Sequence, residues 1–341
     1  MDEHPAPQGA NGLSFLQPIP RHLVHRAAVA EVFLTDAVAV AENRFLLAAQ
    51  WPRDHAMYCP DAAGTSDPLL FAETIRQALV YLAHRHYGVP LSHRFIGCDM
   101  DFEITDPRRL RVGAAPVPVV LEADWSWEAN KPPHRYGMRL EVALTVEGEQ
   151  CGRGSLRVIA VDDKRYALLR GRAGRSRGAG TAANAAHVAG RGRMPAVAVG
   201  RLRAKDSVLV RGREQGEWWL ELDLDHAILF DHPSDHAPLM ATLEGFRQLG
   251  HLLARAAETD AGTDVEAGTN VEAGPPTLVS LSTDCLAFGE LDDPIRLVVR
   301  DDRTEPGPGG SPVRRFMIDA MQNGIVLASS RTGWLPAHRA V

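Results

Sequence analysis

One stretch of the chain occurs twice. The copies cover residues 67–85 and 237–255, and each places a Glu-x-x-Arg-Gln motif inside an otherwise apolar run. The glutamates of the two motifs lie 171 residues apart, so the sequence indicates a duplicated domain and not a solenoid of short repeats. If each copy is a helix, its polar residues share one narrow stripe, and apolar residues cover the remaining surface. Such a helix is buried, and a buried charged stripe requires partners or a function.

The two stripes allow a structural and a functional interpretation. Each glutamate can form an ion pair with the arginine three residues later. Alternatively, burial raises the pKa of the glutamate and makes it a general base, while the arginine binds a phosphate. His84, His251 and Arg255 lie further along the same stripes. The stripes begin with the following residues: Glu73, Arg76 and Gln77 in the first copy, and Glu244, Arg247 and Gln248 in the second.

Length and composition fit a two-domain globular protein. The 341 residues exceed what one hydrophobic core usually fills, and 45% of them are hydrophobic. The net charge of −6 argues against general nucleic-acid binding. Four scattered cysteines and an N-terminus without a signal pattern predict reduced thiols and a cytoplasmic location. Charges inside the longest apolar runs argue against a membrane span.

Strand-like segments flank both predicted helices in the same order. The alternation of apolar and polar residues predicts strands before each helix, over residues 24–52 and again over 199–210 and 217–230. Further strands are predicted after each helix. Asn323-Gly324, between two alternating runs, predicts a type I′ hairpin turn, and the first half is expected to fold back at Glu147-Gly148-Glu149.

Composition sets the expected domain boundaries. Residues 1–19 form a flexible lead-in, and residues 20–168 form the first domain. An Arg-, Gly- and Ala-rich stretch at 169–196 is expected to be a flexible basic linker. The second domain covers 197–341 and carries a low-complexity insertion at 257–276, in which TDVEAG and TNVEAG are near-copies.

The order of a strand-rich lead, one long buried helix and several antiparallel strands resembles the hotdog fold. The chain more closely resembles the A-factor biosynthesis family, the γ-butyrolactone autoregulator synthases. The resemblance covers about residues 20–336 and is carried by these segments: Val24-His25-Arg26, AQWPRDH at 49–55, DPLLFAETIRQ at 67–77, DHPSDHAP at 231–238 and LEGFRQ at 243–248. It implies an α+β chain of two tandem hotdog folds packed as a pseudo-dimer.

The resemblance also implies an activity and its partners. Such an enzyme transfers a β-ketoacyl group from acyl carrier protein, or from an acyl-CoA, to dihydroxyacetone phosphate in signal or secondary-metabolite biosynthesis. By motif match, Glu73, Glu244 and Arg247 are the catalytic candidates. The substrate-binding candidates are these residues: Arg76, Gln77, Gln248, His55, His232 and His236. No metal or other cofactor is expected, because no ligand cluster or nucleotide-binding motif is present.

Other interpretations stay open on the sequence. The three histidines that precede the helices can contact substrate, or they can fix loops. The family usually has Pro-Gly-Met at the start of the second helix, whereas this chain has Pro238-Leu239-Met240. A side chain there hinders close approach of a thioester, so the second half is the weaker acyl-site candidate. The alternative functions are a hotdog thioesterase or dehydratase, and a non-catalytic acyl-binding regulator.

Overall fold

The structure is a computed structural model, which describes residues 12–175, 191–261, 275–307 and 311–336. The chain forms two compact units, and each is described by itself. Their residues are as follows: Met1–Tyr58 with Thr65–Leu168 in the first unit, and Cys59–Gly64 with Leu169–Val341 in the second.

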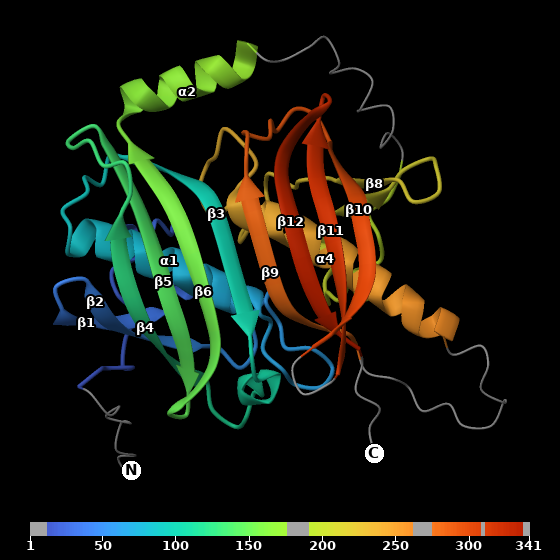
Figure 1. The fold of residues 1–341 in the computed structure, drawn as a ribbon, viewed down its shortest axis with the longest axis horizontal. Helices are drawn as coiled ribbons and strands as arrows, with labels where there is room; N and C mark the ends of the chain where they lie inside the picture. Colours follow the sequence, from blue (N-terminus) through green and yellow to red (C-terminus); the bar gives the residue numbers. More distant parts are fainter. Residues whose placement is uncertain (1–11, 176–190, 262–274, 308–310, 337–341) are drawn as a thin grey trace. The chain divides into compact units, whose positions relative to one another are not determined.

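In the first unit one long helix, α1 (Leu69–Arg85), packs against β3, β5 and β6 of an antiparallel sheet (Figure 1). The strands are hydrogen-bonded in the order β1-β2-β4-β5-β6-β3. Two 3-10 turns precede β1, and a third lies between β3 and β4. The remaining elements have these bounds: η1 Arg21–Val24, η2 Val29–Glu31, β1 Leu34–Ala41, β2 Arg44–Trp51, β3 Arg94–Ile104, η3 Pro107–Leu110, β4 Val117–Trp127, β5 Arg135–Val146 and β6 Glu149–Val161.

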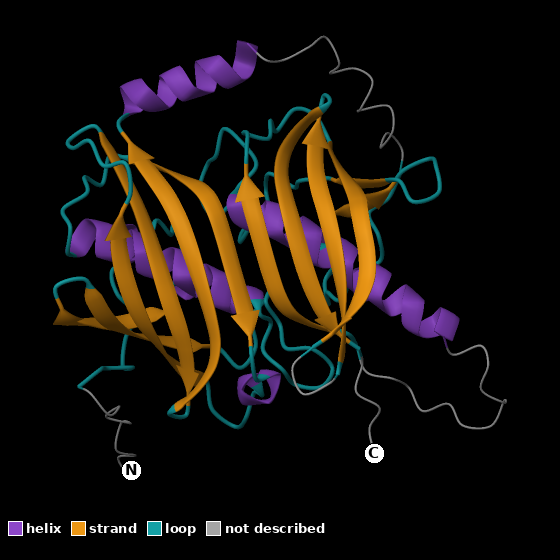
Figure 2. Ribbon diagram, in the orientation of Figure 1, coloured by secondary structure: helices purple, strands orange, loops and turns teal. Residues whose placement is uncertain are grey.

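The second unit repeats this plan around α4 (Leu239–Ala261), which packs against β9, β11 and β12 (Figure 2). Its strands follow the order β9-β12-β11-β10-β8-β7, which corresponds strand for strand to the order read from β3 to β1 in the first unit. Helix α2 (Asp163–Arg175) begins in the first unit and ends in the second. The remaining elements have these bounds: η4 Ala196–Val199, η5 Ala204–Asp206, β7 Leu209–Arg211, β8 Trp218–Leu220, β9 Thr277–Cys285, β10 Ile295–Pro306, β11 Pro312–Gln322 and β12 Ile325–Leu335. The predicted tandem hotdog fold is confirmed, and the pseudo-dimer packing stays a prediction.

Both central helices are buried because their sequences are apolar on almost every side. Helix α1 has no internal glycine or proline, and Asp67 accepts a hydrogen bond from the Leu69 N–H at its start. Helix α4 contains two glycines where neighbours approach closely. A Cβ atom on Gly245 would lie 2.9 Å from Leu220, and one on Gly250 would lie 2.7 Å from the Trp334 ring. These glycines allow α4 to reach its sheet.

Two hairpins carry the turn that the sequence indicates. Asn323 and Gly324 join β11 to β12, and both have positive φ angles, 52° and 76°. Glu147 and Gly148 join β5 to β6 with φ angles of 52° and 82°. Positive φ at both central residues is what a type I′ turn requires. The turns set the register of the β5–β6 and β11–β12 ribbons.

The segment before each helix differs from the prediction. Residues 24–33 contain 3-10 turns and no strand, and β1 begins only at Leu34, whereas the rest of the predicted region forms the strands β1 and β2. The polar side chains of Arg26 and Glu31 are buried rather than turned to solvent. In the second half, residues 199–208 likewise contain turns, and only Trp218–Leu220 of the predicted strand at 217–230 is extended. Alternation was misleading here because the polar residues point inward.

The predicted linkers are in part regular. Helix α2 runs to Arg175 and therefore includes the first residues of the predicted basic linker, while residues 176–190 lie outside the described residues. Helix α4 continues to Ala261, inside the predicted insertion, of which residues 262–274 are not described. The described part of the lead-in begins at residue 12. Within the described residues, no helix combines the length and hydropathy needed to cross a bilayer.

Candidate functional site

The glutamate of the first helix lies in a closed hydrogen-bonded cluster. Glu73 is fully buried, and its carboxylate accepts hydrogen bonds from Arg26 at 3.0 Å, from Arg76 at 2.8 and 2.9 Å, and from Gln77 at 2.7 Å. Arg26 is itself buried and makes a second contact, Nη2 to Oε2, at 2.6 Å. All three predicted residues of the stripe are brought together. The sequence analysis did not assign Arg26 to the site.

This cluster reverses the expected ionisation of Glu73. Burial raises the pKa of the carboxyl, but the charges of Arg26 and Arg76 and their hydrogen bonds outweigh burial and lower the pKa to about 2. The predicted ion pair with Arg76 is therefore found, and the alternative of a raised pKa was wrong because Arg76 and Arg26 together outweigh burial. A carboxylate held in this way is a weak base near neutral pH.

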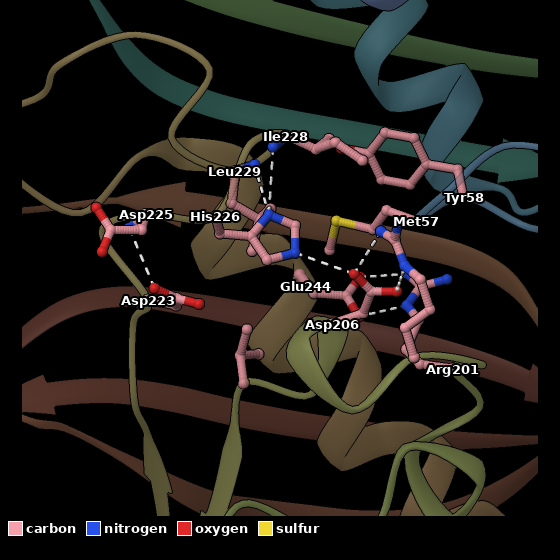
Figure 3. A network of polar contacts seen from close by, with 12 residues as sticks. Met57, Tyr58, Arg201, Asp206, Asp223, Asp225, His226, Ile228, Leu229 and Glu244 are labelled. Carbon is pink, nitrogen blue, oxygen red and sulfur yellow. Dashed lines mark hydrogen bonds and ion pairs between the residues drawn. The ribbon is translucent and has the colours of Figure 1, made fainter.

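The second helix repeats the cluster with one difference. Arg201 is buried and binds both carboxylate oxygens of Glu244, one of them at 2.7 Å, and Gln248 donates to the same carboxylate at 2.6 Å (Figure 3). Arg247 lies 3.8 Å from Glu244, beyond hydrogen-bond distance. Its guanidinium donates instead to the carbonyls of Val199 and Gly200, at 3.0 and 3.1 Å. In the first unit Arg76 likewise donates to the Val24 carbonyl, at 3.1 Å.

The two glutamines fasten the preceding segment to each helix. Gln77 accepts from the Phe33 N–H at 2.9 Å and donates to the Glu31 carbonyl at 2.7 Å. Gln248 makes the equivalent pair with Val208 and Asp206, at 2.9 and 2.7 Å. These bonds satisfy backbone groups that no strand pairs. The glutamines therefore hold the peptide backbone in place and leave little capacity for a substrate.

His55 fixes a loop. Its Nδ1 accepts hydrogen bonds from the backbone N–H groups of Met57 and Tyr58, at 3.2 and 3.0 Å, and its Nε2 lies 3.3 Å from a Glu31 oxygen. A ring nitrogen that accepts two N–H bonds carries no proton, so the proton is on Nε2 and faces the carboxylate. His55 is 7% exposed, which fits this role.

The counterpart of His55 in the second unit is His226, which the sequence analysis missed. His226 Nδ1 accepts from Ile228 and Leu229, at 3.3 and 3.1 Å, and Nε2 lies 3.0 Å from Asp206 (Figure 3). Burial raises the pKa of Asp206, but hydrogen bonds from His226 and Arg203 outweigh it and hold that pKa below its ordinary value. A sequence signal existed, because Asp-His-Ala occurs at residues 54–56 and 225–227, with the 171-residue offset of the glutamates.

His232 and His236 lie on the loop that leads into α4. The His232 side chain is 54% exposed, and its Nδ1 is 3.7 Å from Asp231. The His236 Nδ1 lies 2.8 Å from Asp235, and the His236 ring packs edge-on against Phe288. Arg170 pairs with Asp235 at 3.3 Å. Asp235 thus lies between the Arg170 guanidinium and the His236 imidazole.

The starts of the two helices differ in their hydrogen bonding. In α1 the N–H groups of Leu69, Leu70 and Phe71 bond to Asp67 and Pro68. In α4, by contrast, the N–H groups of residues 239–241 have no hydrogen-bond partner among the described residues, and the first bonded N–H is that of Thr242. Unpaired N–H groups and the helix dipole favour a negative charge at this position. The expectation that the second half is the weaker acyl site stays a prediction.

The chain is similar in sequence to one family of known proteins. The family model of the A-factor biosynthesis hotdog domain matches residues 8–162 and 192–337. A Streptomyces virginiae protein named 2-oxo-3-(phosphooxy)propyl 3-oxoalkanoate synthase is 40% identical over 231 residues, covering 67% of this chain and 75% of that protein. A Streptomyces griseus protein of the same name is 31% identical over 248 residues, covering 71% and 77%. A solved structure, a conserved protein of unknown function with hot dog fold from Alicyclobacillus acidocaldarius, covers 91% of this chain and 97% of that chain at 14% identity, with a TM-score of 0.44.

Proposed function

Because the chain belongs to the A-factor biosynthesis hotdog family, we propose that it is an acyltransferase that joins a β-ketoacyl group to dihydroxyacetone phosphate. The observation that carries this function is the 40% identity to a synthase whose name states its product. That product is an ester with a 3-oxoalkanoate acyl part and a phosphorylated hydroxyketone alcohol part. The donor is a β-ketoacyl thioester, carried by acyl carrier protein or coenzyme A.

The reaction transfers an acyl group from sulfur to oxygen. The hydroxyl oxygen of the acceptor forms a bond to the thioester carbonyl carbon, and the carbon–sulfur bond breaks. The hydroxyl proton passes to a base and then to the departing thiolate. In between, the carbonyl oxygen carries negative charge and requires hydrogen-bond donors. A site for this reaction therefore needs a base, oxyanion donors and a place for the phosphate.

The start of α4 provides the oxyanion donors in this proposal. Its N–H groups at residues 239–241 have no protein partner among the described residues, whereas the first N–H of α1 is already bonded to Asp67. A thioester carbonyl at this position would receive backbone donors that need no rearrangement during the reaction. Preorganised donors of this type contribute about 10²–10³ in rate.

His236 is the base in this proposal. It lies three residues before the first residue of α4, its side chain is 25% exposed, and Asp235 contacts its Nδ1. This contact favours the tautomer in which Nε2 accepts a proton from the acceptor hydroxyl and later returns it to the sulfur. The Arg170 contact holds Asp235 in turn. The arrangement follows the general pattern of a base oriented by a carboxylate.

Glu73, Glu244 and Arg247 act as positioning residues in this proposal. The Glu73 carboxylate bonds to Arg26 and the Glu244 carboxylate to Arg201, while the Arg247 guanidinium bonds to the backbone before α4. Arg76, Gln77 and Gln248 also bond to the backbone before their helices. His55 holds its loop in place. Glu244, Arg247 and Gln248 fix α4, on which the unpaired N–H groups lie, and the first-unit residues fix α1 in the same way. His232 has no role in the proposed chemistry.

The function is tested by incubating the full-length protein with a β-ketoacyl thioester and dihydroxyacetone phosphate. We expect thiol release that depends on the acceptor, together with an equal amount of phosphorylated ester detected by mass spectrometry. Thiol release without acceptor, with free acid as the product, would instead identify a thioesterase. Binding of the thioester without turnover would identify a regulator. The rates of ester formation with the carrier-protein thioester and with the coenzyme A thioester are compared to determine the donor.

A further inference from the structure

The first unit contains a cavity of about 770 Å³ at one end of its sheet. It lies between the loop that joins β3 to β4 and the turn that joins β5 to β6, and residues 106–118 supply most of its lining. Thr65 pairs with Arg111, and the Ser66 N–H bonds to the Leu110 carbonyl at 2.9 Å. The cavity wall is therefore joined directly to the residues that lead into α1.

Three arginines line this cavity; Arg108 is hydrogen-bonded to a carboxylate, and Arg109 is in longer ion pairs with two carboxylates. Arg108 makes two hydrogen bonds to the Asp106 carboxylate, at 2.8 and 3.1 Å. The nearest carboxylate oxygens to Arg109 belong to Glu147 and Asp106, at 3.8 and 3.9 Å, which is too far for hydrogen bonds. The Arg111 side chain has no hydrogen bond or ion pair with any described residue. Arg109 and Arg111 therefore keep donor capacity for an anion.

The other lining residues are mainly apolar. Val112, Pro116, Val117 and Val146 contribute carbon surface next to the two guanidinium groups. A bare inorganic ion would leave this surface in contact with water. A ligand with an anionic end and a short carbon chain would cover the surface and also satisfy the arginines.

We propose that this cavity binds the phosphate ester group of a substrate through Arg109 and Arg111. A guanidinium matches the geometry of phosphate oxygens and can bind two of them at once. The choice of phosphate rests on the proposed function, in which two phosphate esters take part: the hydroxyketone acceptor and the phosphopantetheine arm of the donor. Arg76 and Arg247, the phosphate candidates on the helices, bond instead to backbone carbonyls.

The test measures binding to the full-length protein by isothermal titration calorimetry. The probes are dihydroxyacetone phosphate, 4′-phosphopantetheine and inorganic phosphate. Replacement of both arginines, Arg109→Gln with Arg111→Gln, is expected to weaken binding of one of the two esters about tenfold or more. Arg108→Gln is the matched control, because its guanidinium is already occupied, and the ester should bind within about twofold of the wild-type affinity. Glu147→Gln removes a competing carboxylate and is expected to tighten binding.

The ester that loses affinity identifies the source of the phosphate. Ester binding that is equal in the wild type and the double variant would overturn the proposal, as would no ester binding, or binding of inorganic phosphate alone. Circular dichroism verifies that the exposed substitutions leave the fold intact. Ester synthesis by the wild-type protein tests the proposed function separately, so a failure of the cavity does not imply a failure of the reaction.

Discussion

Two buried arginines pair with the glutamates of the central helices. Arg26 and Arg201 come from the turns before the helices, and their side chains are 5% and 0% exposed. An isolated carboxylate in such an environment would be strongly destabilising, so each glutamate depends on its arginine. Removal of one partner leaves the other charge buried without compensation, which costs more than the net contribution of the intact pair.

Arg201→Met is therefore expected to lower the free energy of unfolding by about 3–5 kcal/mol. Arg247, at 3.8 Å, is too far away to replace the lost hydrogen bonds to Glu244. Urea denaturation measures the change. Arg153→Met is the matched control, because the Arg153 side chain in its pair with Glu103 is 70% exposed, and it should cost less than about 1 kcal/mol. Equal losses in the two variants would contradict the assigned role of Arg201.

The low pKa of Glu73 predicts a specific loss of stability in acid. The pKa is lowered from 4.5 to about 2 in the folded protein, so the folded state binds the proton less readily than the unfolded chain. The stabilisation, about 3 kcal/mol, is fully present above the unfolded pKa and disappears as the pH falls from about 5 to 2. Urea unfolding at pH 5, 4 and 3 tests this. Glu73→Gln should flatten the dependence, and an unchanged slope would show that other carboxyls cause it.

At the scale of elements, the two central helices have similar buried polar networks, but the hydrogen bonding of their first N–H groups differs. Leu239→Pro removes one unpaired N–H at the first position of α4, where proline is tolerated. We expect kcat for ester formation to fall about 10²–10³-fold while circular dichroism stays unchanged. Leu239→Ala is the control, since it shortens the side chain but keeps the N–H, and it should stay near the wild-type rate. Similar losses in both variants would assign the effect to packing.

Close packing of α4 on β12 gives a second prediction at this scale. Gly250→Ala would place a Cβ atom 2.7 Å from the Trp334 indole, which is buried and bonded to Thr332. The unfolding free energy should fall by about 1–3 kcal/mol. Gly171→Ala, in α2, meets nothing within 4 Å and should instead be neutral or stabilise by up to about 1 kcal/mol. Thermal denaturation of the two variants measures the contrast, and equal melting temperatures would contradict it.

The sequence predicted those elements that depend on a single local signal. The central helices follow from apolar runs, and the turn at Asn323-Gly324 follows from its dipeptide. The segments at 24–33 and 199–208 were mistaken for strands, because alternation does not reveal whether a polar side chain points to solvent or to a buried partner. Arg26 and Arg201 were missed for the same reason. The unpaired N–H groups of α4 were not predictable from the sequence. Whether they find an acceptor depends on the conformation of the preceding loop.

At the scale of the whole chain, the two halves repeat these buried polar residues at similar sequence offsets. Arg26 and Arg201 are 175 residues apart, while the two helix glutamates are 171 residues apart, as are His55 and His226. Each unit therefore has the same network of arginine, glutamate, glutamine and histidine. The halves differ in features outside this network. The first has the arginine-lined cavity, and the second has the open helix start with His236.

The proposal that acyl transfer takes place at the start of α4 is tested most directly by the rate of phosphorylated ester formation by full-length His236→Gln. The account predicts a loss of about 10²–10⁴-fold, with a normal fold. His134→Gln is the matched control, because His134 also contacts a carboxylate, Asp162, at 2.9 Å, but lies in the first unit, and its rate should equal that of the wild type. A wild-type rate in His236→Gln would contradict the placement of acyl transfer at the start of α4.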